Sequence, residues 1–398
     1  MGVQMDDVVI IDGARTAFGS LNGGLKSDTA TDLGAVVARE ALRRSDVDPE
    51  LIDHVVFGNV VQSCKDAPYL ARHIGLSVGV PIEVPGLTVN RLCASGLEAA
   101  LIGAQQLLLG ESSAVLVGGT ENMTQCPHLI RGSRDGFKLG HAEVEDYILV
   151  ALTDQWNGLM MGLTAENLAE MYHISREEQD EFACRSHLLA AEARENGRFG
   201  EEIVGVEIKD RRGNTIVVER DEHIRADASP ESLAALRPVF KKSGTVTAGN
   251  SCGINDGAAA LVMTTAKKAQ DLGLKPLGRL ISWANVGVNP DIMGIGPVDA
   301  TRKALKRAGM KLEDIELIEL NEAFAAQYLA CERELGLDRE KVNVNGGAIA
   351  LGHPVGASGA RTTLTLLYEM RKRGLRYGLS TLCVGGGMGI AAVLECLQ

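Results

Sequence analysis

The chain carries one stretch of sequence twice, and this duplication restricts its fold more than any other feature. Residues 39–57 read REALRRSDVDPELIDHVVF and residues 302–320 read RKALKRAGMKLEDIELIEL, an offset of 263 positions. An Ala-Ser-Gly step, which we expect to open a helix, occurs at 94–96 and again at 357–359 with the same offset. The duplication predicts two similar halves related by a pseudo-twofold axis, with their equivalent helix starts face to face.

Within each half, apolar strand-like runs alternate with helical patterns. The first half shows strands near 8–11, 55–58 and 114–117, and helices near 31–44 and 95–109. The last of these helices is apolar on nearly every face, so we expect it to be buried. Such alternation predicts an α/β protein with helices layered on a largely parallel sheet.

A more polar segment separates the two halves. Residues 175–178 form a capping box ahead of a helix. Residues 203–209 and 215–219 alternate apolar and polar residues around a turn at 211–214, which predicts an exposed hairpin. We therefore expect an N-terminal half at 1–119 plus 245–272, an inserted domain at 120–244, and a C-terminal half at 273–398.

Composition and charge exclude several classes of protein. The chain has 398 residues, of which 45% are hydrophobic and 23% charged, with a net charge of −12. The composition is that of an ordinary globular protein, and the negative charge argues against nonspecific nucleic-acid binding. The eight cysteines show neither a CxxC pair nor Cys/His spacing for a metal. With no basic signal segment and no membrane-length apolar run, we expect a cytoplasmic protein with free thiols, no metal and no membrane contact.

Two reactive residues lie near the paired helix starts. Cys93 precedes the first Ala-Ser-Gly step, where the helix dipole should stabilise a thiolate and lower the pKa of the thiol. His353 lies ahead of the second step, in the glycine-rich run 345–356. Facing each other across the axis, they would form a nucleophile and its base. The alternatives are a packed core cysteine and a histidine that is only a satisfied polar residue.

Two further candidates follow or end apolar strands. Asn321 comes directly after the strand-like run 315–320, at the carboxyl end where α/β folds tend to bind ligands, and it could also cap the next helix. Cys383 precedes a glycine-rich run, whose small residues would let a substrate approach closely. The segment 387–392 matches a loose dinucleotide fingerprint, but only six residues follow it, too few for the helix that such a site needs.

One motif supports a different class of enzyme. The segment GNSCG at 249–253 satisfies G-x-S-x-G, so a serine hydrolase would place its nucleophile at Ser251. His353 is the only histidine downstream of that serine. A hydrolase is therefore the alternative from another class.

Taken in order, these motifs resemble those of the thiolase family along essentially the whole chain. The matching stretches are VNRLCASGLEA (89–99), GGTENM (118–123), GTVTAGN (244–250), NEAF (321–324), NGGAIALGHPVGASGAR (345–361) and LCVGGGMG (382–389). The resemblance implies two βαβαβαββ halves packed as α-β-α-β-α layers. The inserted domain would cover the active site and bind coenzyme A.

The resemblance also implies a role for each candidate. Cys93 would be the acylated nucleophile, His353 the base that activates it, and Cys383 the acid/base at the substrate α-carbon. Asn321 would hold a water in one oxyanion hole, and the backbone N–H groups of Cys93 and Gly385 would form the other. Coenzyme A contacts are expected at Met161, Arg225, Ala248, Ser251 and Cys252. The family's pantetheine-contacting serine falls at Cys252, with Ser251 as the alternative.

The implied reaction is a reversible, ping-pong condensation of two acetyl-CoA molecules to acetoacetyl-CoA and coenzyme A. No cofactor is implied, since coenzyme A is itself substrate and product. Met160 stands where some acetoacetyl-forming members carry a histidine. That departure favours the alternative within the family, a 3-ketoacyl-CoA thiolase of fatty-acid β-oxidation that accepts longer chains. A homotetramer or homodimer is the expected assembly.

Overall fold

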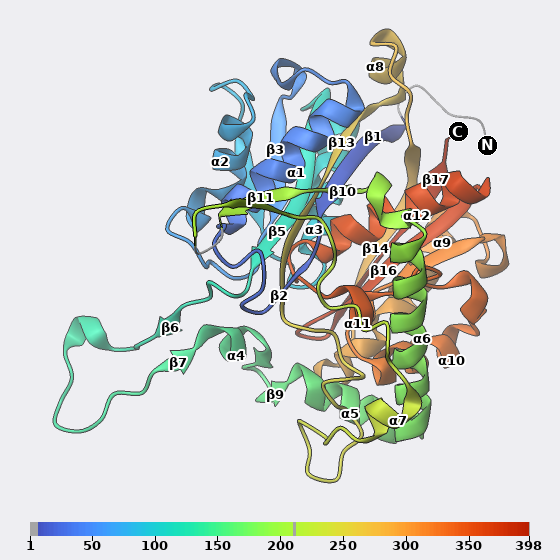
Figure 1. Cartoon of the computed structure of the whole chain (residues 1–398). Coiled ribbons are helices and arrows are strands. Elements are labelled where there is room, and N and C mark those ends of the chain that lie inside the picture. The colour runs from blue at the N-terminus through green and yellow to red at the C-terminus, as the bar shows by residue number, and fades with distance from the viewer. Residues whose placement is uncertain (1–6, 210–211, 398) are drawn as a thin grey trace.

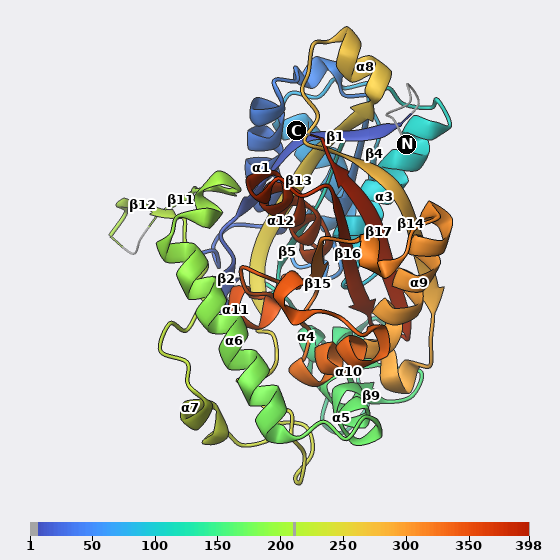
Figure 2. The ribbon, with the colours of Figure 1, turned by 90° about the vertical axis from the view of Figure 1, so that its right-hand side faces the viewer.

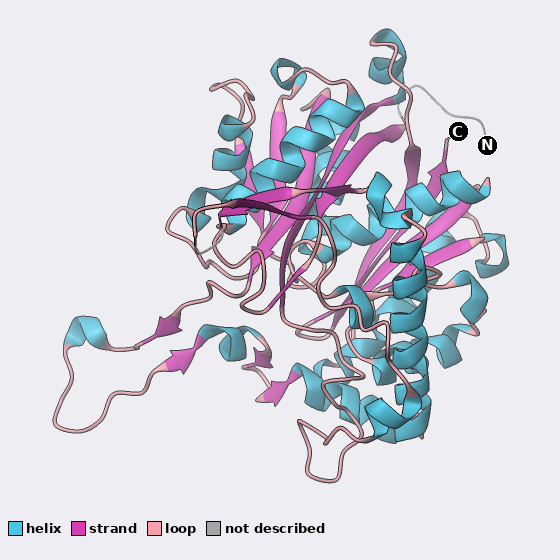
Figure 3. Cartoon of the chain, in the orientation of Figure 1, coloured by secondary structure: helices cyan, strands magenta, loops and turns pink. Residues whose placement is uncertain are grey.

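The two halves of the chain repeat one order of strands. A computed structural model describes residues 7–209 and 212–397, and within them an eleven-stranded mixed sheet runs through the molecule (Figures 1 and 3). In each half the first pairing of the repeat is parallel and the next two are antiparallel. The order is β3 (His54–Gly58), β5 (Ala114–Asn122), β13 (Asn255–Thr265) and β1 (Val8–Thr16) in the first half, and β15 (Leu317–Leu320), β16 (Tyr377–Val384), β17 (Met388–Cys396) and β14 (Gly278–Gly287) in the second.

The sheet is not the largely parallel one that the alternation of elements predicted. β16 and β17 form an antiparallel hairpin across a glycine-rich turn, in which Gly386 and Gly387 have φ of 77° and 79°. β5 and β13 pair in the same antiparallel way, although the inserted segment separates them in sequence. In each repeat, the last two strands along the chain are neighbours in the sheet and pair antiparallel. These strands are β5 and β13 in the first half and β16 and β17 in the second. An antiparallel pair does not need the crossover helix that joins two parallel strands.

Helices form three layers around the two halves of the sheet (Figure 2). The main helices are α1 (Ala30–Ser45), α3 (Ser95–Leu108), α9 (Gly296–Ala308), α10 (Ala325–Leu335) and α12 (Ser358–Arg373). α1 packs on β1 and β13, and α9 packs on β14 and β17. Between them, α3 contacts β3, β5 and α12, and α12 contacts β16. The expected α-β-α-β-α layers are confirmed, and the central layer contains the two paired helix starts.

Local sequence signals set the ends of the helices. Thr29 caps α1, where its hydroxyl accepts from the N–H of Asp32 and the Asp32 carboxylate accepts from the N–H of Thr29. The predicted capping box of Ser175 and Glu178 is present at the start of α6 (Arg176–Glu195). Both helix starts therefore follow from short-range sequence alone.

The inserted segment leaves the body between β5 and β13. Its predicted hairpin is present as β11 (Val206–Lys209) and β12 (Thr215–Val218), although residue 211 of the turn lies outside the described residues. The start of that first predicted strand instead forms β10 (Ile203–Val204), which pairs in parallel with β1. A long arm with the short strands β6 (His128–Leu129) and β7 (Glu145–Asp146) projects from the body (Figure 1).

The remaining elements are short. They are β2 (Gly19–Ser20), β4 (Gly86–Val89), β8 (Thr153–Asp154), β9 (Leu159–Met160), α2 (Leu70–Ser77), α4 (Tyr147–Ala151), α5 (Met161–Met171), α7 (Pro230–Ala234), α8 (Ala266–Asp271) and α11 (Ala348–Leu351). β9 leads directly into α5, and α11 lies in the glycine-rich loop before α12.

Candidate active site

A cavity of about 420 Å³ lies between the inserted segment and the two halves. Most of its wall is apolar, formed by methionine, leucine, valine, isoleucine and phenylalanine side chains. His353 lines it. So do all five residues expected to contact coenzyme A, which are Met161, Arg225, Ala248, Ser251 and Cys252. Segments far apart in sequence thus converge on one pocket.

Cys93 lies at the end of a strained turn that leads into α3. Leu92, which precedes it, has φ of 47°, a left-handed conformation that is costly for a residue with a branched side chain. Ser95 stabilises the turn, because its hydroxyl donates to the Leu92 carbonyl at 2.7 Å and accepts from the Arg91 N–H at 2.9 Å. Asn90 adds a third bond, from the Leu92 N–H to its Oδ1 at 2.9 Å. Backbone strain of this kind concentrates at functional sites.

The thiol of Cys93 is neutral in the resting molecule. Burial raises its pKa to about 11, although backbone hydrogen bonds from Gly385 and from Cys93 itself act in the opposite direction. The side chain, partly exposed, packs against the apolar residues Met123, Ile148 and Val355. The expectation that the helix dipole lowers the pKa of this thiol is wrong for the resting state, because loss of hydration outweighs the favourable backbone groups. A base must therefore remove the proton.

His353 has the tautomer that a base requires. Its Nδ1 lies 2.5 Å from the hydroxyl of Ser358, and that hydroxyl donates its own proton to the Pro354 carbonyl at 3.0 Å. The hydroxyl then accepts from Nδ1–H, which leaves Nε2 as the unprotonated, accepting nitrogen of the ring. Burial, reinforced by the charge of Arg361, lowers the pKa of the imidazole to about 3. The neutral ring can accept a proton at Nε2.

Asn321 lies beside that nitrogen. Its Nδ2 is 3.5 Å from His353 Nε2, and its buried Oδ1 has no hydrogen-bond partner among the described residues. The side chain therefore has a free acceptor beside the proposed base. The sequence also allowed Asn321 to cap the next helix, and that prediction is wrong. α10 begins four residues later, and its N-cap is Phe324.

Cys383 comes from the opposite half to Cys93. It lies near the end of β16 and is fully buried. Burial and the nearby thiols of Cys93, Cys331 and Cys252 raise its pKa well above the usual value. Gly385 follows β16, and a Cβ there would lie 3.0 Å from a methyl group of Leu92. The loop after β16 therefore lies against the turn that carries Cys93.

Three supporting residues were not assigned roles from the sequence. Glu322 accepts hydrogen bonds from Ser186, Asn343 and the N–H of Ile349, and so holds the glycine-rich loop before His353. Asn255 accepts the His353 N–H at 2.9 Å. In the sequence, Ser358 is recognisable only as part of the repeated Ala-Ser-Gly step. Nothing in that motif indicates the hydrogen bond between its hydroxyl and His353 Nδ1.

Glu121 connects the loops of the two halves. Its buried carboxylate accepts from Asn59 Nδ2 and from the N–H groups of Val60, Val61 and Gly356, at 2.9–3.0 Å. Burial raises the pKa of this carboxyl to about 8, and the backbone donors oppose that shift. Gly356 lies just after His353, so Glu121 fixes the histidine loop to the half that carries Cys93.

The alternative nucleophile has no base. Ser251 lines the cavity, but its hydroxyl donates to the Thr247 carbonyl at 2.7 Å, and no imidazole of the described residues is hydrogen-bonded to it. Within residues 7–209 and 212–397, no cluster of three or more His, Cys, Asp or Glu side chains is arranged to hold a metal ion. Nor is any helix there both long and apolar enough to cross a bilayer.

Comparisons with known proteins agree with the geometry. The N-terminal thiolase domain matches residues 8–267 and the C-terminal thiolase domain matches 274–396. The chain is 50% identical to an acetyl-CoA acetyltransferase of Chromobacterium violaceum, over 98% of this chain and 99% of that protein. It is 48% identical to the mitochondrial 3-ketoacyl-CoA thiolase of Homo sapiens, over 98% of both.

Solved structures show the same relationship. The crystal structure of human mitochondrial 3-ketoacyl-CoA thiolase superposes with a TM-score of 0.97 at 46% identity, covering 99% of this chain and 100% of that one. The structure of that enzyme in complex with CoA gives 0.96 at 46% identity, with both chains fully covered. This chain therefore belongs to the thiolase family of acyltransferases.

Proposed function

We propose that this chain catalyses the reversible condensation of two acetyl-CoA molecules to acetoacetyl-CoA and free coenzyme A. The observation that carries the proposal is the neutral imidazole of His353, which is held at Nδ1 by Ser358 and lines a cavity together with every residue expected to bind coenzyme A. Cys93 packs against Met123 and Val355, which also line this cavity.

The first half-reaction transfers an acetyl group to Cys93. His353 Nε2 takes the proton of the Cys93 thiol, and the thiolate attacks the thioester carbonyl of acetyl-CoA. The C–S bond to coenzyme A then breaks, and the departing thiolate receives the proton from His353. Backbone N–H groups of Cys93 and Gly385 bind the developing oxyanion. Each such donor contributes about 3 kcal/mol in comparable sites.

The second half-reaction forms the new carbon–carbon bond. His353 Nε2, uncharged again after the first half-reaction, takes the proton of the Cys383 thiol, and the Cys383 thiolate removes a proton from the α-carbon of a second acetyl-CoA. The resulting carbanion attacks the acyl carbonyl on Cys93, and the Cys93 sulfur leaves as a thiolate. Asn321 and His353 stabilise the enolate oxygen, with a water bound at the free Oδ1 of Asn321. The proton held on His353 Nε2 then passes to the Cys93 thiolate, which regenerates the starting state.

Coenzyme A would lie along the cavity wall. Arg225 supplies the cationic contact for the nucleotide, while Met161 and Ala248 pack against the pantetheine arm. The Ser251 hydroxyl is already engaged by the Thr247 carbonyl, which favours Cys252 as the group that meets the arm. The apolar wall also supports the second candidate, thiolysis of longer 3-oxoacyl-CoA chains, because Met160, Leu149 and Leu152 could contact an acyl tail.

We also propose that the chain self-associates as a dimer or tetramer and acts in the cytoplasm. The projecting arm exposes four apolar side chains, those of Ile130, Phe137, Leu139 and Val144. Apolar surface of this kind on a projecting segment is typical of an interface. All eight cysteines are unpaired, which fits a reducing compartment.

Acylation by acetyl-CoA tests the proposed function directly. We expect intact-protein mass spectrometry to show one added acetyl group on the wild type and none on Cys93→Ser. The matched control is Cys126→Ser, which changes a thiol in the same apolar cluster that has no role in the proposed mechanism. It should acylate normally. If a fluorophosphonate abolishes activity and iodoacetamide does not, the thiolase mechanism fails and a serine nucleophile replaces it.

A further inference from the structure

Two acidic residues that the proposed mechanism does not use come just before a residue expected to bind coenzyme A. Asp221 and Glu222 follow the hairpin of β11 and β12, and His223 and Arg225, which come next, line the active-site cavity. Asp221 is buried, whereas Glu222 is exposed. Both carboxylates bond residues 15–24 of the N-terminal half, and each does so in a different way.

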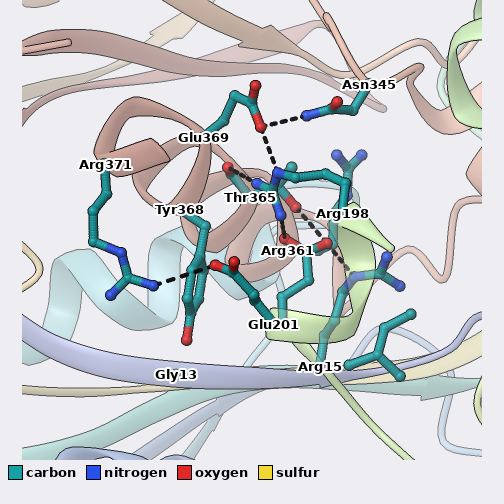
Figure 4. Close-up of polar contacts among 12 residues, drawn as sticks. Gly13, Arg15, Arg198, Glu201, Asn345, Arg361, Thr365, Tyr368, Glu369 and Arg371 are labelled. Carbon is teal, nitrogen blue, oxygen red and sulfur yellow. Dashed lines mark hydrogen bonds and ion pairs between the residues drawn. The ribbon is translucent and has the colours of Figure 1, made fainter. Parts of the chain in front are cut away.

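Asp221 is held by a buried cation. Its carboxylate accepts from Arg15 Nη1 at 2.7 Å and Nη2 at 2.9 Å, and from the Phe18 N–H at 2.8 Å. Arg15 Nε donates to Glu202 at 2.6 Å. Glu202 also pairs with Arg198, which Figure 4 shows near Arg15. Removing one partner would leave a buried charge unpaired, so a substitution here would disturb the fold as a whole.

Glu222 is held by backbone groups alone. Its Oε2 accepts from the Ser20 N–H at 2.8 Å, and its Oε1 accepts from the Gly24 N–H at 2.9 Å. The N–H of Glu222 donates to the Phe18 carbonyl at 3.0 Å. A Cβ on Gly23 would lie 2.0 Å from Oε2, and a Cβ on Gly24 would lie 2.6 Å from Oε1. The carboxylate therefore occupies a place in this turn that only glycine leaves open.

The other end of the segment 221–225 is tied to a different element. The Arg225 N–H donates to Nδ1 of His187 at 3.2 Å, and His187 is buried in α6. The segment is thus fixed at both ends by bonds to other parts of the chain, and His223 and Arg225 line the cavity between or beside these bonds. A coenzyme A molecule that contacts Arg225 would depend on where these bonds place the segment.

We propose that Glu222 is a positioning residue for coenzyme A: its carboxylate, bound by the turn at 20–24, holds the segment 221–225 where Arg225 can contact the nucleotide. This inference rests on the proposed function. Without this anchor, the segment would occupy its binding position for a smaller fraction of the time, and the apparent affinity for coenzyme A esters would fall by the same factor. The chemical step at Cys93 should keep its rate.

The experiment separates coenzyme A binding from the geometry of the base, because the same part of the chain also reaches His353. The Gly19 carbonyl accepts from Asn255 Nδ2 at 3.0 Å, and Asn255 Oδ1 accepts the His353 N–H at 2.9 Å. Acylation of Cys93 is therefore measured with two donors, acetyl-CoA and the acetyl thioester of N-acetylcysteamine. The second donor has the reacting thioester but lacks the nucleotide, so its reaction should not depend on Arg225.

Rapid quench and mass spectrometry give the acylation rate constant of the full chain at each donor concentration. In Glu222→Gln, an amide N–H would face one of the two backbone N–H groups, so one bond is lost. We expect the acetyl-CoA concentration at half-maximal rate to rise about fivefold to tenfold. The maximal rate constant, and the rate with the truncated donor, should not change.

Two further variants support the assignment. Gly24→Ala should reproduce the effect of Glu222→Gln, because the added Cβ would displace the carboxylate from the turn. The matched control is Glu219→Gln, which changes an exposed glutamate three residues before Glu222. It should leave the reaction with both donors unchanged.

Each other outcome contradicts the proposal in a distinct way. If Glu222→Gln slows acylation by both donors equally, Glu222 supports the base or the fold and has no particular role for coenzyme A. If it changes neither reaction, Asp221 and His187 hold the segment without it. In both cases the wild type still forms acyl-Cys93, so the proposed function stands. If the wild type is acylated by neither donor, the proposed function fails and this inference fails with it.

Discussion

Gly96 of α3 and Gly359 of α12 each lie against the backbone of the other helix. A Cβ on Gly96 would be 2.8 Å from the backbone nitrogen of Ala360, and a Cβ on Gly359 would meet the backbone nitrogen of Leu97. The two glycines are 263 positions apart in the duplicated chain. The repeat therefore places a glycine at the same position in both helix starts, where the missing side chain lets the two backbones approach closely. This approach brings the loops of Cys93 and His353 to one site.

Gly359→Ala should destabilise the protein because backbone atoms of α3 cannot move away from the added methyl group. We expect a loss of about 3 kcal/mol in the free energy of unfolding, near the upper end for overpacked sites. Urea denaturation followed by circular dichroism measures it. Gly200→Ala is the matched control, since no atom lies within 4 Å of its added Cβ, and it should change stability little. Equal effects of the two substitutions would contradict the close helix contact.

Ser358→Ala should slow acylation of Cys93. The substitution removes the acceptor that holds His353 Nδ1–H and fixes the tautomer. We expect a roughly tenfold to hundredfold lower rate constant, as for other partners that orient a functional histidine. Thr363→Val serves as the control, because its hydroxyl bonds only the Gly359 carbonyl of the same helix. A normal acylation rate in Ser358→Ala would show that the ring needs no such support.

Cys383→Ser should separate the two half-reactions. Acyl-Cys93 should form at a rate near that of the wild type, while condensation falls by roughly a hundredfold or more because a hydroxyl is a poor substitute for the acid/base. Burst kinetics of coenzyme A release, followed by acetoacetyl-CoA formation, resolves the two steps. Failure of this variant to acylate would mean that the roles of Cys93 and Cys383 are exchanged.

Much of the fold could be predicted because its signals are local or repeated. The capping box at Ser175 and Glu178 sets a helix start through bonds three residues apart. The 263-residue offset correctly predicted that the starts of α3 and α12 meet. Strand direction was predicted less well, because the pairing of β5 with β13 joins segments on either side of the inserted segment.

The electrostatics of the site could not be predicted from sequence. The pKa of Cys93 depends on desolvation by Met123, Ile148 and Val355, which no motif places near the thiol. The bonds of Glu121 to the loop at 59–61 and to Gly356 span up to 235 positions and leave no periodic pattern. Such contacts follow only from the folded arrangement.

The raised pKa of Cys93 predicts how the free enzyme reacts with alkylating agents. Because the thiol has a pKa of about 11, the thiolate fraction should rise about tenfold per pH unit between about pH 7 and about pH 10. The rate constant for iodoacetamide at Cys93, followed by mass spectrometry, should rise in the same proportion. A small free thiol, the control, should level off above about pH 9. A plateau near neutral pH for Cys93 would instead indicate a resting thiolate.

Met160 should limit the length of the acyl chain. Its side chain lines the cavity at the end of β9, beside Leu152 and Met161, so removing it enlarges the apolar space next to the proposed thioester site. In Met160→Ala, the ratio of kcat/KM for a long 3-oxoacyl-CoA to that for acetoacetyl-CoA should rise about tenfold, a typical effect of small changes in apolar pocket volume. Thiolysis rates across a ladder of chain lengths measure this ratio.

The control for that experiment is Met171→Ala, because Met171 ends α5, the helix that begins directly after Met160, and its side chain is 57% exposed. It should leave the chain-length profile unchanged. If Met160→Ala and Met171→Ala give the same profile as the wild type, the acyl chain does not extend toward β9. The apolar wall at Met160 would then serve the pantetheine arm alone, and short substrates would remain the better assignment.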